Sequence, residues 1–190
     1  MNGSFPVGAN RVLVSEVPAW EKWVPRLIKE LDSNRHEIKH SHKIRGRWEN
    51  SYLAENFVPT VREPIRFARD LGKKDLKINS VALFEPLSFS NNPYPPFWFN
   101  LSRPGEETGL HDHVSSAVLS AVVYLSSGED SGNLYFKTDA GEEFEVPPRV
   151  GRVVVFSPAL KHGVRINNSL SERVSLAFNL YPFPLPYDLL

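Results

Sequence analysis

A series of short β-rich segments from residue 75 onward restricts the fold more than any other feature of this chain. Each segment is rich in β-branched and aromatic residues, and Gly, Pro, Asn or Asp separates most of them. This period suits strands rather than helices, so the sequence predicts an antiparallel double sheet or barrel. The segments are KINSVALFE (77–85), FWFNLS (97–102), AVLSAVVYL (117–125), NLYFKT (133–138), EFEV (143–146), RVVVFS (152–157), GVRIN (163–167) and RVSLAFNLY (173–181).

Two helices are predicted before these strands. Residues 15–32, SEVPAWEKWVPRLIKELD, place apolar residues at three- and four-residue steps, with Ser15 as the N-cap and Pro25 expected to kink or break the helix. Residues 60–71 form the second helix, where Thr60 has capping-box spacing and Gly72 is the expected stop. Residues 33–58 are interpreted as loop with one short strand. The tryptophans at 20, 23 and 98 are interpreted as packing residues.

The expected organisation is a single domain over residues 1–190. In it, a helical layer (15–72) packs on a β core (75–181), which gives a mainly β, α+β fold with N-terminal helices. A chain of 190 residues is long enough for such a core.

Composition excludes several classes of function. The 22 basic residues balance the 22 acidic ones, so nothing indicates a nucleic-acid or anionic-membrane partner. The absence of cysteine excludes disulfides, zinc–thiolate sites and iron–sulfur clusters. No apolar segment has the length of a signal-peptide core or a membrane span, so a cytoplasmic protein is expected.

Two histidines begin the stretch GLHDHVSSAVLSAVVYL. His111 and His113 are two positions apart at the start of a strand, so their side chains share one face and Asp112 points the other way. His162 follows the strand RVVVF and a short turn, which can return it to the same end of the barrel. Three convergent imidazoles form a site for iron, copper or zinc. The cluster KHSHK (39–43) has no apolar framing and is interpreted as solvated.

A buried arginine is predicted on the last strand. In ERVSLAFNLY (172–181), alternation places Val174, Leu176, Phe178 and Leu180 on a core face and Arg173, Ser175, Ala177 and Asn179 on the other. If that second face lines the lumen of a closed barrel, Arg173 needs an anion there, and a carboxylate would suit its guanidinium.

These residues resemble the iron(II)- and 2-oxoglutarate-dependent dioxygenase superfamily. Its motif is His-x-Asp or His-x-Glu, a distal His about fifty residues later, and an Arg about ten residues further on. Here the corresponding residues are His111, His113, His162 and Arg173, and Ser175 completes the family's common Arg-x-Ser. SGNLYF (131–136) and GRVVVFSPALKHGV also resemble family segments. The matched region spans about residues 98–181.

The resemblance implies a double-stranded β-helix, also called a jelly roll or cupin-like barrel. It implies that His111, His113 and His162 bind iron(II), and that Arg173, Ser175 and Tyr124 bind the 5-carboxylate of 2-oxoglutarate. With dioxygen as the other cosubstrate, hydroxylation of a C–H bond is the expected outcome. The substrate would be a small molecule or an amino-acid or peptide group, and the oligomeric state stays open.

Position 113 departs from the family, because most members carry aspartate there. Some uncharacterised branches show His-x-His at this point, and three histidines are the first expectation. A β-bulge could instead turn Asp112 toward the metal. A third arrangement makes His113 the first ligand and leaves a gap at Ser115 for chloride, as in related halogenases.

Two other classes of function remain as alternatives. A cupin-type metal enzyme shares the jelly roll, but it needs a glutamate where Ala117 and Val118 stand, and it has no need of Arg173. A jelly roll with purely structural histidines could be a non-catalytic binding protein. Iron and 2-oxoglutarate binding would separate these alternatives from the oxygenase.

Overall fold

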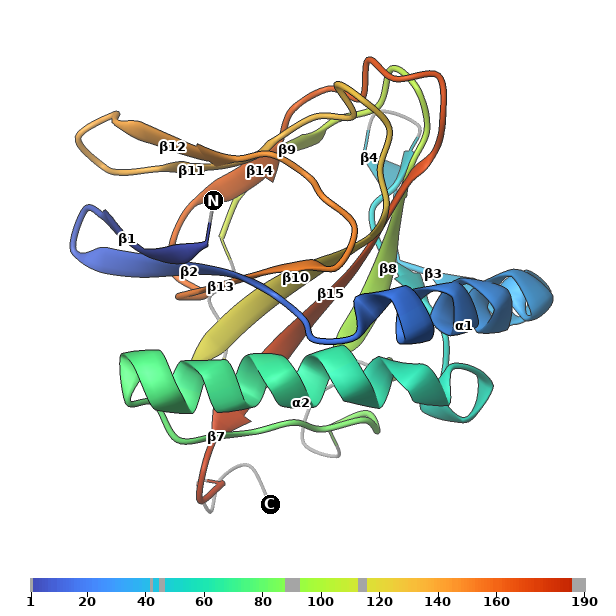
Figure 1. Cartoon of the computed structure of the whole chain (residues 1–190), viewed down its shortest axis with the longest axis horizontal. Helices are drawn as coiled ribbons and strands as arrows, with labels where there is room; N and C mark the ends of the chain where they lie inside the picture. Colours follow the sequence, from blue (N-terminus) through green and yellow to red (C-terminus); the bar gives the residue numbers. More distant parts are fainter. Residues whose placement is uncertain (1, 42, 45–46, 88–92, 113–115, 186–190) are drawn as a thin grey trace.

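The computed structural model describes residues 2–41, 43–44, 47–87, 93–112 and 116–185. Two antiparallel sheets face one another, and two helices lie side by side across the outer face of the larger sheet (Figure 1). The mainly β fold with a helical layer, expected from the sequence, is confirmed.

The larger sheet has the strand order β1–β2–β13–β10–β15–β8–β6–β3, and β7 pairs with β15. Its strands are β1 (Gly3–Val7), β2 (Asn10–Glu16), β3 (Lys39–His40), β6 (Ser51–Tyr52), β7 (Ser80–Val81), β8 (Phe97–Ser102), β10 (Leu119–Ser126), β13 (Arg152–Phe156) and β15 (Arg173–Pro182).

The smaller sheet has the order β12–β11–β14–β9 and covers the inner face of the larger one. Its strands are β9 (Thr108–His111), β11 (Leu134–Lys137), β12 (Glu143–Val146) and β14 (His162–Val164). A separate hairpin joins β4 (Lys43–Ile44) to β5 (Arg47–Trp48). Pairing β14 with β9 brings the two halves of the predicted metal motif to adjacent strands, although they are about fifty residues apart in the sequence.

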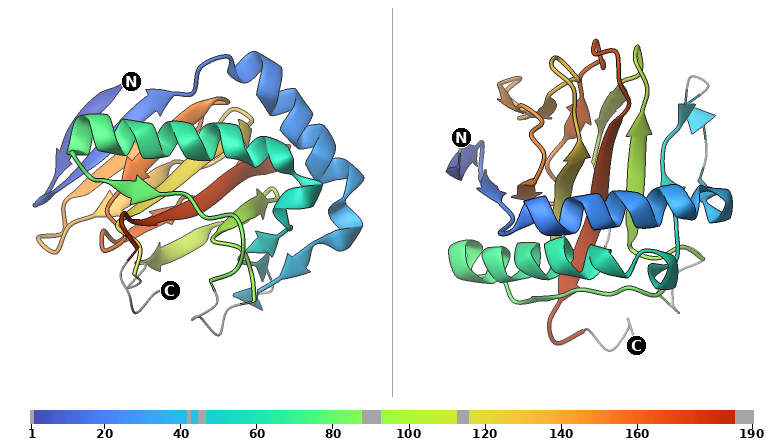
Figure 2. Two further views of the ribbon diagram at one scale, coloured as in Figure 1. Left: turned by 90° about the horizontal axis from the view of Figure 1, so that it is seen from below. Right: turned by 45° about the vertical axis from the view of Figure 1, so that its right-hand side comes forward.

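The helices α1 (Trp20–Ser33) and α2 (Arg62–Leu71) form the layer below the larger sheet (Figure 2). Their apolar stripes meet the outward-facing side chains of β10, β13, β15 and β8 in one core cluster, which includes Leu27, Ile65 and Leu176. Short helical turns connect these elements: η1 (Arg35–Glu37), η2 (Glu55–Phe57), η3 (Pro59–Val61) and the π-helical η4 (Gly72–Leu76).

A second core lies between the two sheets. It is formed by side chains of alternate residues of the same strands, including Val154, Phe156 and Tyr124, together with Leu134 and Phe136 from the smaller sheet. The central strand β13 is therefore buried along its whole length, which explains its almost continuous apolar sequence RVVVF.

The structure corrects the predicted N-terminal region. Ser15 is not a helix cap but part of β2, and α1 begins at Trp20 after Ala19, whose φ is +52°. Pro25 lies inside α1 without dividing it. The hairpin β1–β2 was not predicted, although RVLV is rich in β-branched residues and Gly8 supplies a positive φ at the turn.

Other predicted boundaries also differ. The helix α2 starts at Arg62, and the Thr60 hydroxyl donates to Glu30 instead of capping that helix. Gly72 does not stop the helix, which continues through a π-helical turn to Leu76. Only Ser80–Val81 of the segment 77–85 forms a strand. None of the described helices is long and apolar enough to span a membrane.

Candidate functional site

A cavity opens between the two sheets, and it contains most of the residues that the sequence singled out. His111, His162, Tyr124, Arg173 and Ser175 all line it. The other lining residues are Glu49, Asn50, Trp98, Asn100, Thr108, Ser120, Ala121, Val122, Leu134, Phe156, Val164, Ala177 and Phe178.

His111 and His162 face one another across the β9–β14 pair. They are register partners in the antiparallel ladder, and their ring centroids lie 4.4 Å apart with an interplanar angle of 51°. His162 is buried against Phe136 and Phe156, whereas His111 is exposed. One imidazole of the pair is thus buried in the lumen and the other is accessible to solvent. A metal ion bound by both would keep coordination positions open for other ligands.

Backbone carbonyls hold both imidazoles in the same way. Nδ1 of His111 lies 2.8 Å from the carbonyl oxygen of Gly109, and Nδ1 of His162 lies 2.8 Å from that of Leu160. A carbonyl oxygen can only accept, so each Nδ1 carries the proton and each neutral ring has its lone pair on Nε2. This arrangement orients histidines for binding a metal through Nε2.

The third predicted ligand, His113, lies outside the described residues, as does Ser115. Asp112 is described and exposed, and it does not join His111 and His162 in a metal-binding group. Within the described part of the chain, no set of three His, Asp or Glu side chains is placed to hold a metal ion. His40, from the KHSHK cluster, stacks on Trp48 at a centroid distance of 4.7 Å.

Arg173 lies between the sheets at the start of β15, with only 1% of its surface exposed. Its Nη1 donates to the carbonyl oxygens of Ser131 and Gly132. Gly132 has a φ of +88°, and a Cβ atom there would lie 2.1 Å from the carbonyl oxygen of Arg165. The loop that holds Arg173 can therefore pack against the backbone of Arg165 only because residue 132 is glycine.

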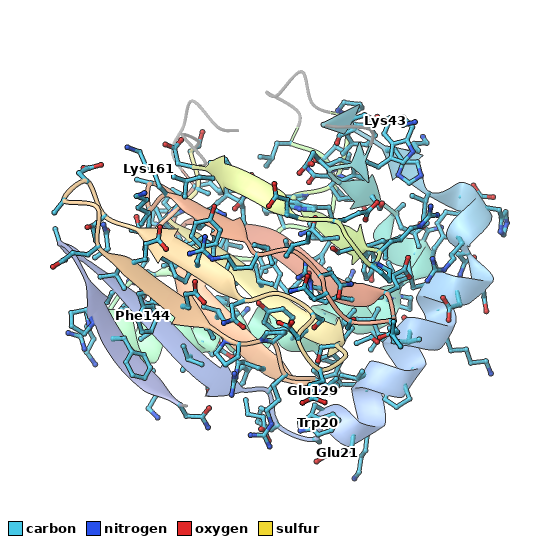
Figure 3. All side chains as sticks on the ribbon, turned by 90° about the horizontal axis from the view of Figure 1, so that it is seen from above. Trp20, Glu21, Lys43, Glu129, Phe144 and Lys161 are labelled. Carbon is cyan, nitrogen blue, oxygen red and sulfur yellow. The ribbon has the colours of Figure 1, made fainter. Side chains whose placement is uncertain are left out.

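The two halves of this site lie toward different ends of β11. His162 pairs with Phe136, whereas Ser131 and Gly132, which hold Arg173, precede the first residue of the strand. Figure 3 shows the neighbouring segments well apart, with Lys161 on the same side as Lys43 of the β4–β5 hairpin and Glu129 on the other side, near Trp20.

Tyr124 is buried beside Arg173, and its hydroxyl donates to no acceptor among the described residues. Burial raises the pKa of Tyr124 to about 12, although the positive charges of Arg173 and Arg152 and the backbone N–H of Leu134 act in the opposite direction. The phenol is therefore neutral at physiological pH and keeps its proton for donation. Ser175 lies opposite Tyr124 in the ladder, and Asn100 lies opposite Ser175.

Residues 137–179 match a family model described as "Putative 2OG-Fe(II) oxygenase". This segment includes His162, Arg173 and Ser175. No curated protein matches the chain.

Solved structures of such enzymes share the fold. A prolyl-4-hydroxylase from Pseudomonas putida is 20% identical, with a TM-score of 0.67 over 90% of this chain and 92% of its own. The epimerase SnoN, solved with Fe³⁺, alpha ketoglutarate and nogalamycin RO, is 14% identical, with a TM-score of 0.68 over 90% and 78%. A Trichoplax adhaerens prolyl hydroxylase, solved with a hypoxia inducible factor peptide fragment, is 8% identical, with a TM-score of 0.66 over 90% and 83%.

The chain thus resembles the 2OG-Fe(II) oxygenases in sequence over residues 137–179 and in fold over most of its length. Its fold is the expected double-stranded β-helix. The family match also favours the oxygenase over the cupin-type and non-catalytic alternatives.

The described residues fit iron(II) and 2-oxoglutarate, the two groups in the name of the matched family. Two imidazoles with lone pairs on Nε2 suit iron(II). Further along the cavity, the buried Tyr124 hydroxyl lies near the charge of Arg173 and donates to no acceptor within the described part of the chain. Buried polar groups are rarely left unsatisfied, so a carboxylate that accepts from Arg173 and Tyr124 would suit this part of the cavity.

Some residues of the candidate site were not predicted. Glu49 and Asn50 lie in a segment interpreted as loop, and Trp98 lines the cavity as well as packing against Tyr52. Arg152 is also buried, and it acts electrostatically on Tyr124. Alternation in RVVVF could have found Arg152, because it shares the face of Val154 and Phe156, but no sequence signal marks Glu49 or Ser131.

Proposed function

We propose that this protein is an iron(II)- and 2-oxoglutarate-dependent oxygenase, an oxidoreductase that uses dioxygen to hydroxylate a C–H bond of a small molecule or of an amino-acid or peptide substrate. His111, His113 and His162 would bind the iron, and Arg173, Ser175 and Tyr124 would bind the distal carboxylate of 2-oxoglutarate. The proposal for His113 is based on its spacing from His111, since it lies outside the described residues.

The bound iron and cosubstrate supply the oxidation: dioxygen places one oxygen atom in the substrate C–H bond and the other in succinate, as 2-oxoglutarate loses carbon dioxide. The protein's own residues position these components. The carbonyls of Gly109 and Leu160 keep the histidine Nε2 atoms available by holding the proton on Nδ1. The apolar rings around His162 limit access of water to that end of the lumen.

The carboxylate end works by preorganisation. The carbonyls of Ser131 and Gly132 fix one nitrogen of Arg173, so the guanidinium holds its orientation before the cosubstrate arrives. A charge-assisted pair with a carboxylate is strong in such a buried site. Tyr124 then donates its phenolic proton to the same anion, which removes the cost of its unsatisfied hydroxyl.

The main observation behind the proposal is that the two paired histidines and the buried arginine line the same cavity. The paired imidazoles of His111 and His162 occupy one end, and the buried Arg173 and Tyr124 lie further along the same lumen. A metal site alone would suit many enzymes, but a buried arginine in the same lumen calls for an anionic cosubstrate.

The test is anaerobic titration of the iron-loaded protein with 2-oxoglutarate. In Arg173→Met, which keeps the apolar volume and removes the charge, affinity for 2-oxoglutarate should fall by roughly a hundredfold or more. Iron affinity should be unchanged. Arg103→Met, which removes an exposed arginine, is the matched control. Equal 2-oxoglutarate affinity in wild type and Arg173→Met would overturn the assignment.

The metal ligands are tested separately by iron titration. His162→Ala should abolish stable iron binding, because it removes a ligand whose orientation the fold fixes. Comparing His113→Ala with Asp112→Ala then decides between the imidazole and carboxylate arrangements. Loss of iron only in Asp112→Ala would replace His113 by Asp112 in the proposal.

A further inference from the structure

Three loops meet at the end of the molecule where β15 begins, with Arg173 as its first residue. They join β8 to β9 (residues 103–107), β10 to β11 (127–133) and β14 to β15 (165–172), and Figure 1 shows them together at the top of the molecule. The last of these loops is hydrogen-bonded to both others through one dipeptide, Asn167–Asn168. This dipeptide therefore links the segments around the arginine.

Asn167 is completely buried, and its polar groups have partners throughout. Its side-chain nitrogen donates to the carbonyl oxygens of Ser102 and Ser171, both at 2.9 Å. Its side-chain oxygen accepts from the backbone N–H and from the hydroxyl of Ser169. Its backbone N–H and carbonyl bond to residues 105–106. Such a buried amide holds its neighbours in one arrangement, because a shift would leave a polar group unsatisfied.

Two of these bonds act on the backbone next to Arg173. Ser102 is the register partner of Arg173 in the β8–β15 ladder, and Ser171 precedes Arg173 by two residues. One amide group thus ties the last residue of β8 to the segment that leads into β15. It fixes the point from which the arginine side chain extends into the cavity that it lines.

The other half of the dipeptide acts on the loop that holds the guanidinium. Nη1 of Arg173 donates to the carbonyl oxygens of Ser131 and Gly132. Asn168 binds the preceding residue, Asp130, through its backbone N–H and its side-chain amide, both at 3.0 Å. Asp130 has a φ of +55°, a left-handed conformation that is unfavourable for a residue with a Cβ atom. The two bonds from Asn168 offset that cost.

The same two loops are in direct contact at Gly128. A Cβ atom there would lie 2.8 Å from the Ser171 hydroxyl oxygen and 2.9 Å from Cβ of Ser169. Ser169 cannot easily move away, because its hydroxyl donates to Asn167 at 2.6 Å. A methyl group at residue 128 would therefore push apart the loop that holds Arg173 and the turn that contains Asn167.

We propose that Asn167 is a positioning residue for the cosubstrate, which holds Arg173 in the orientation that pairs with the distal carboxylate of 2-oxoglutarate. Asn168 and Gly128 serve the same arrangement from the neighbouring loop. The inference rests on the proposed function, because Asn167 acts through Arg173. Its effect should therefore appear only for ligands with a distal carboxylate, and only while Arg173 is present.

The experiment compares two ligands that differ in the distal carboxylate. Iron-loaded protein is titrated anaerobically with 2-oxoglutarate and with 2-oxopentanoate, which has a methyl group in place of that carboxylate. Asn167→Ala should weaken 2-oxoglutarate binding by about three- to thirtyfold, the range for groups coupled through contacts. Its affinities for 2-oxopentanoate and iron should be unchanged. Added to Arg173→Met, the same substitution should cause no further loss of 2-oxoglutarate affinity.

Asn34→Ala is the matched control for stability. The side-chain amide of Asn34 also donates to two carbonyl oxygens, those of Glu30 and Phe57, but it does so in the helical layer. This variant should be less stable than wild type and should bind 2-oxoglutarate with wild-type affinity. Gly128→Ala is a second test that leaves Asn167 intact, and it should weaken 2-oxoglutarate binding in the same selective way.

The outcomes separate this inference from the proposed function. If Arg173→Met weakens 2-oxoglutarate binding but neither Asn167→Ala nor Gly128→Ala does, the inference fails and the proposed function stands. Equal losses for 2-oxoglutarate and 2-oxopentanoate, or a loss that persists in the Arg173→Met background, would also overturn it, because they would show a general structural role. If Arg173→Met binds 2-oxoglutarate as wild type does, both fail.

Discussion

The two faces of strand β15 differ in what they contact, although both are buried. Val174, Leu176, Phe178 and Leu180 point toward the helices and belong to the outer core. Arg173 and Ser175 point between the sheets and line the cavity. Leu176 is 0% exposed and Arg173 is 1% exposed, so burial alone does not distinguish the two faces.

Their energetics do distinguish them. Burying the apolar face is favourable in itself, at about 25 cal/mol per Å² of apolar surface. Burying a guanidinium is costly unless it is paired. The outer face therefore stabilises the fold, whereas the inner face carries the groups that we propose bind 2-oxoglutarate. Changes on the two faces should consequently affect different measurements.

The largest effect should come from the outer face. Leu176 lies opposite Val123 and Phe99 in the neighbouring strands, so Leu176→Ala leaves a cavity in the centre of the outer core. We expect the free energy of unfolding to fall by about 2–5 kcal/mol. Chemical denaturation measures it. Iron and 2-oxoglutarate affinities of the folded variant should stay at wild-type values.

Ser175→Ala is the matched change on the inner face. It should alter the free energy of unfolding far less than Leu176→Ala and should weaken 2-oxoglutarate binding. If Leu176→Ala weakened cosubstrate binding while Ser175→Ala did not, the division between the two faces would be wrong.

A smaller effect should appear in alkaline solution. Tyr124 has a pKa of about 12 in the folded protein because it is buried, and a tyrosine in an unfolded chain ionises near pH 10. Between these values the unfolded state binds fewer protons, so stability is lost as pH rises. Wild type should lose roughly 2 kcal/mol more than Tyr124→Phe between pH 10 and pH 12. Parallel stability curves for the two proteins would contradict this assignment of burial.

Most of the β core could be predicted, because its strands have a strong period and clear turn residues. EFEV and FWFNLS match β12 and β8 in full. The N-terminal hairpin was missed because the helical period starting near Val17 overlaps the end of β2. The Thr60 cap failed for a tertiary reason, since Glu30 from α1 binds its hydroxyl. Local propensity cannot contain such contacts.

Part of the candidate site could likewise be predicted from the sequence, and part could not. Histidines and an arginine at characteristic spacing identified His111, His162 and Arg173, and alternation indicated the inner face of β15. The residues that complete the cavity were not visible, because their roles come from packing between distant segments. Ser131 reaches Arg173 through a backbone carbonyl, which any residue type could provide. Glu49 faces the cavity because β6 pairs with β8.

The smallest expected effect comes from removing a single oxygen atom, the Tyr124 hydroxyl. It tests the comparison of the two faces most directly, because it should weaken ligand binding while leaving the stability of the fold nearly unchanged. Tyr124→Phe removes a buried hydroxyl that donates to no acceptor among the described residues and interacts only weakly with the backbone N–H of Leu134. Without cosubstrate, the variant should have nearly the stability of wild type at pH 7, since no hydrogen bond donated by the hydroxyl is lost. Its affinity for 2-oxoglutarate should nevertheless fall by about fivefold, the value of about 1 kcal/mol for one hydrogen bond. Calorimetric titration of both proteins measures this, and a variant that is destabilised at neutral pH but binds normally would show that the hydroxyl serves the fold instead.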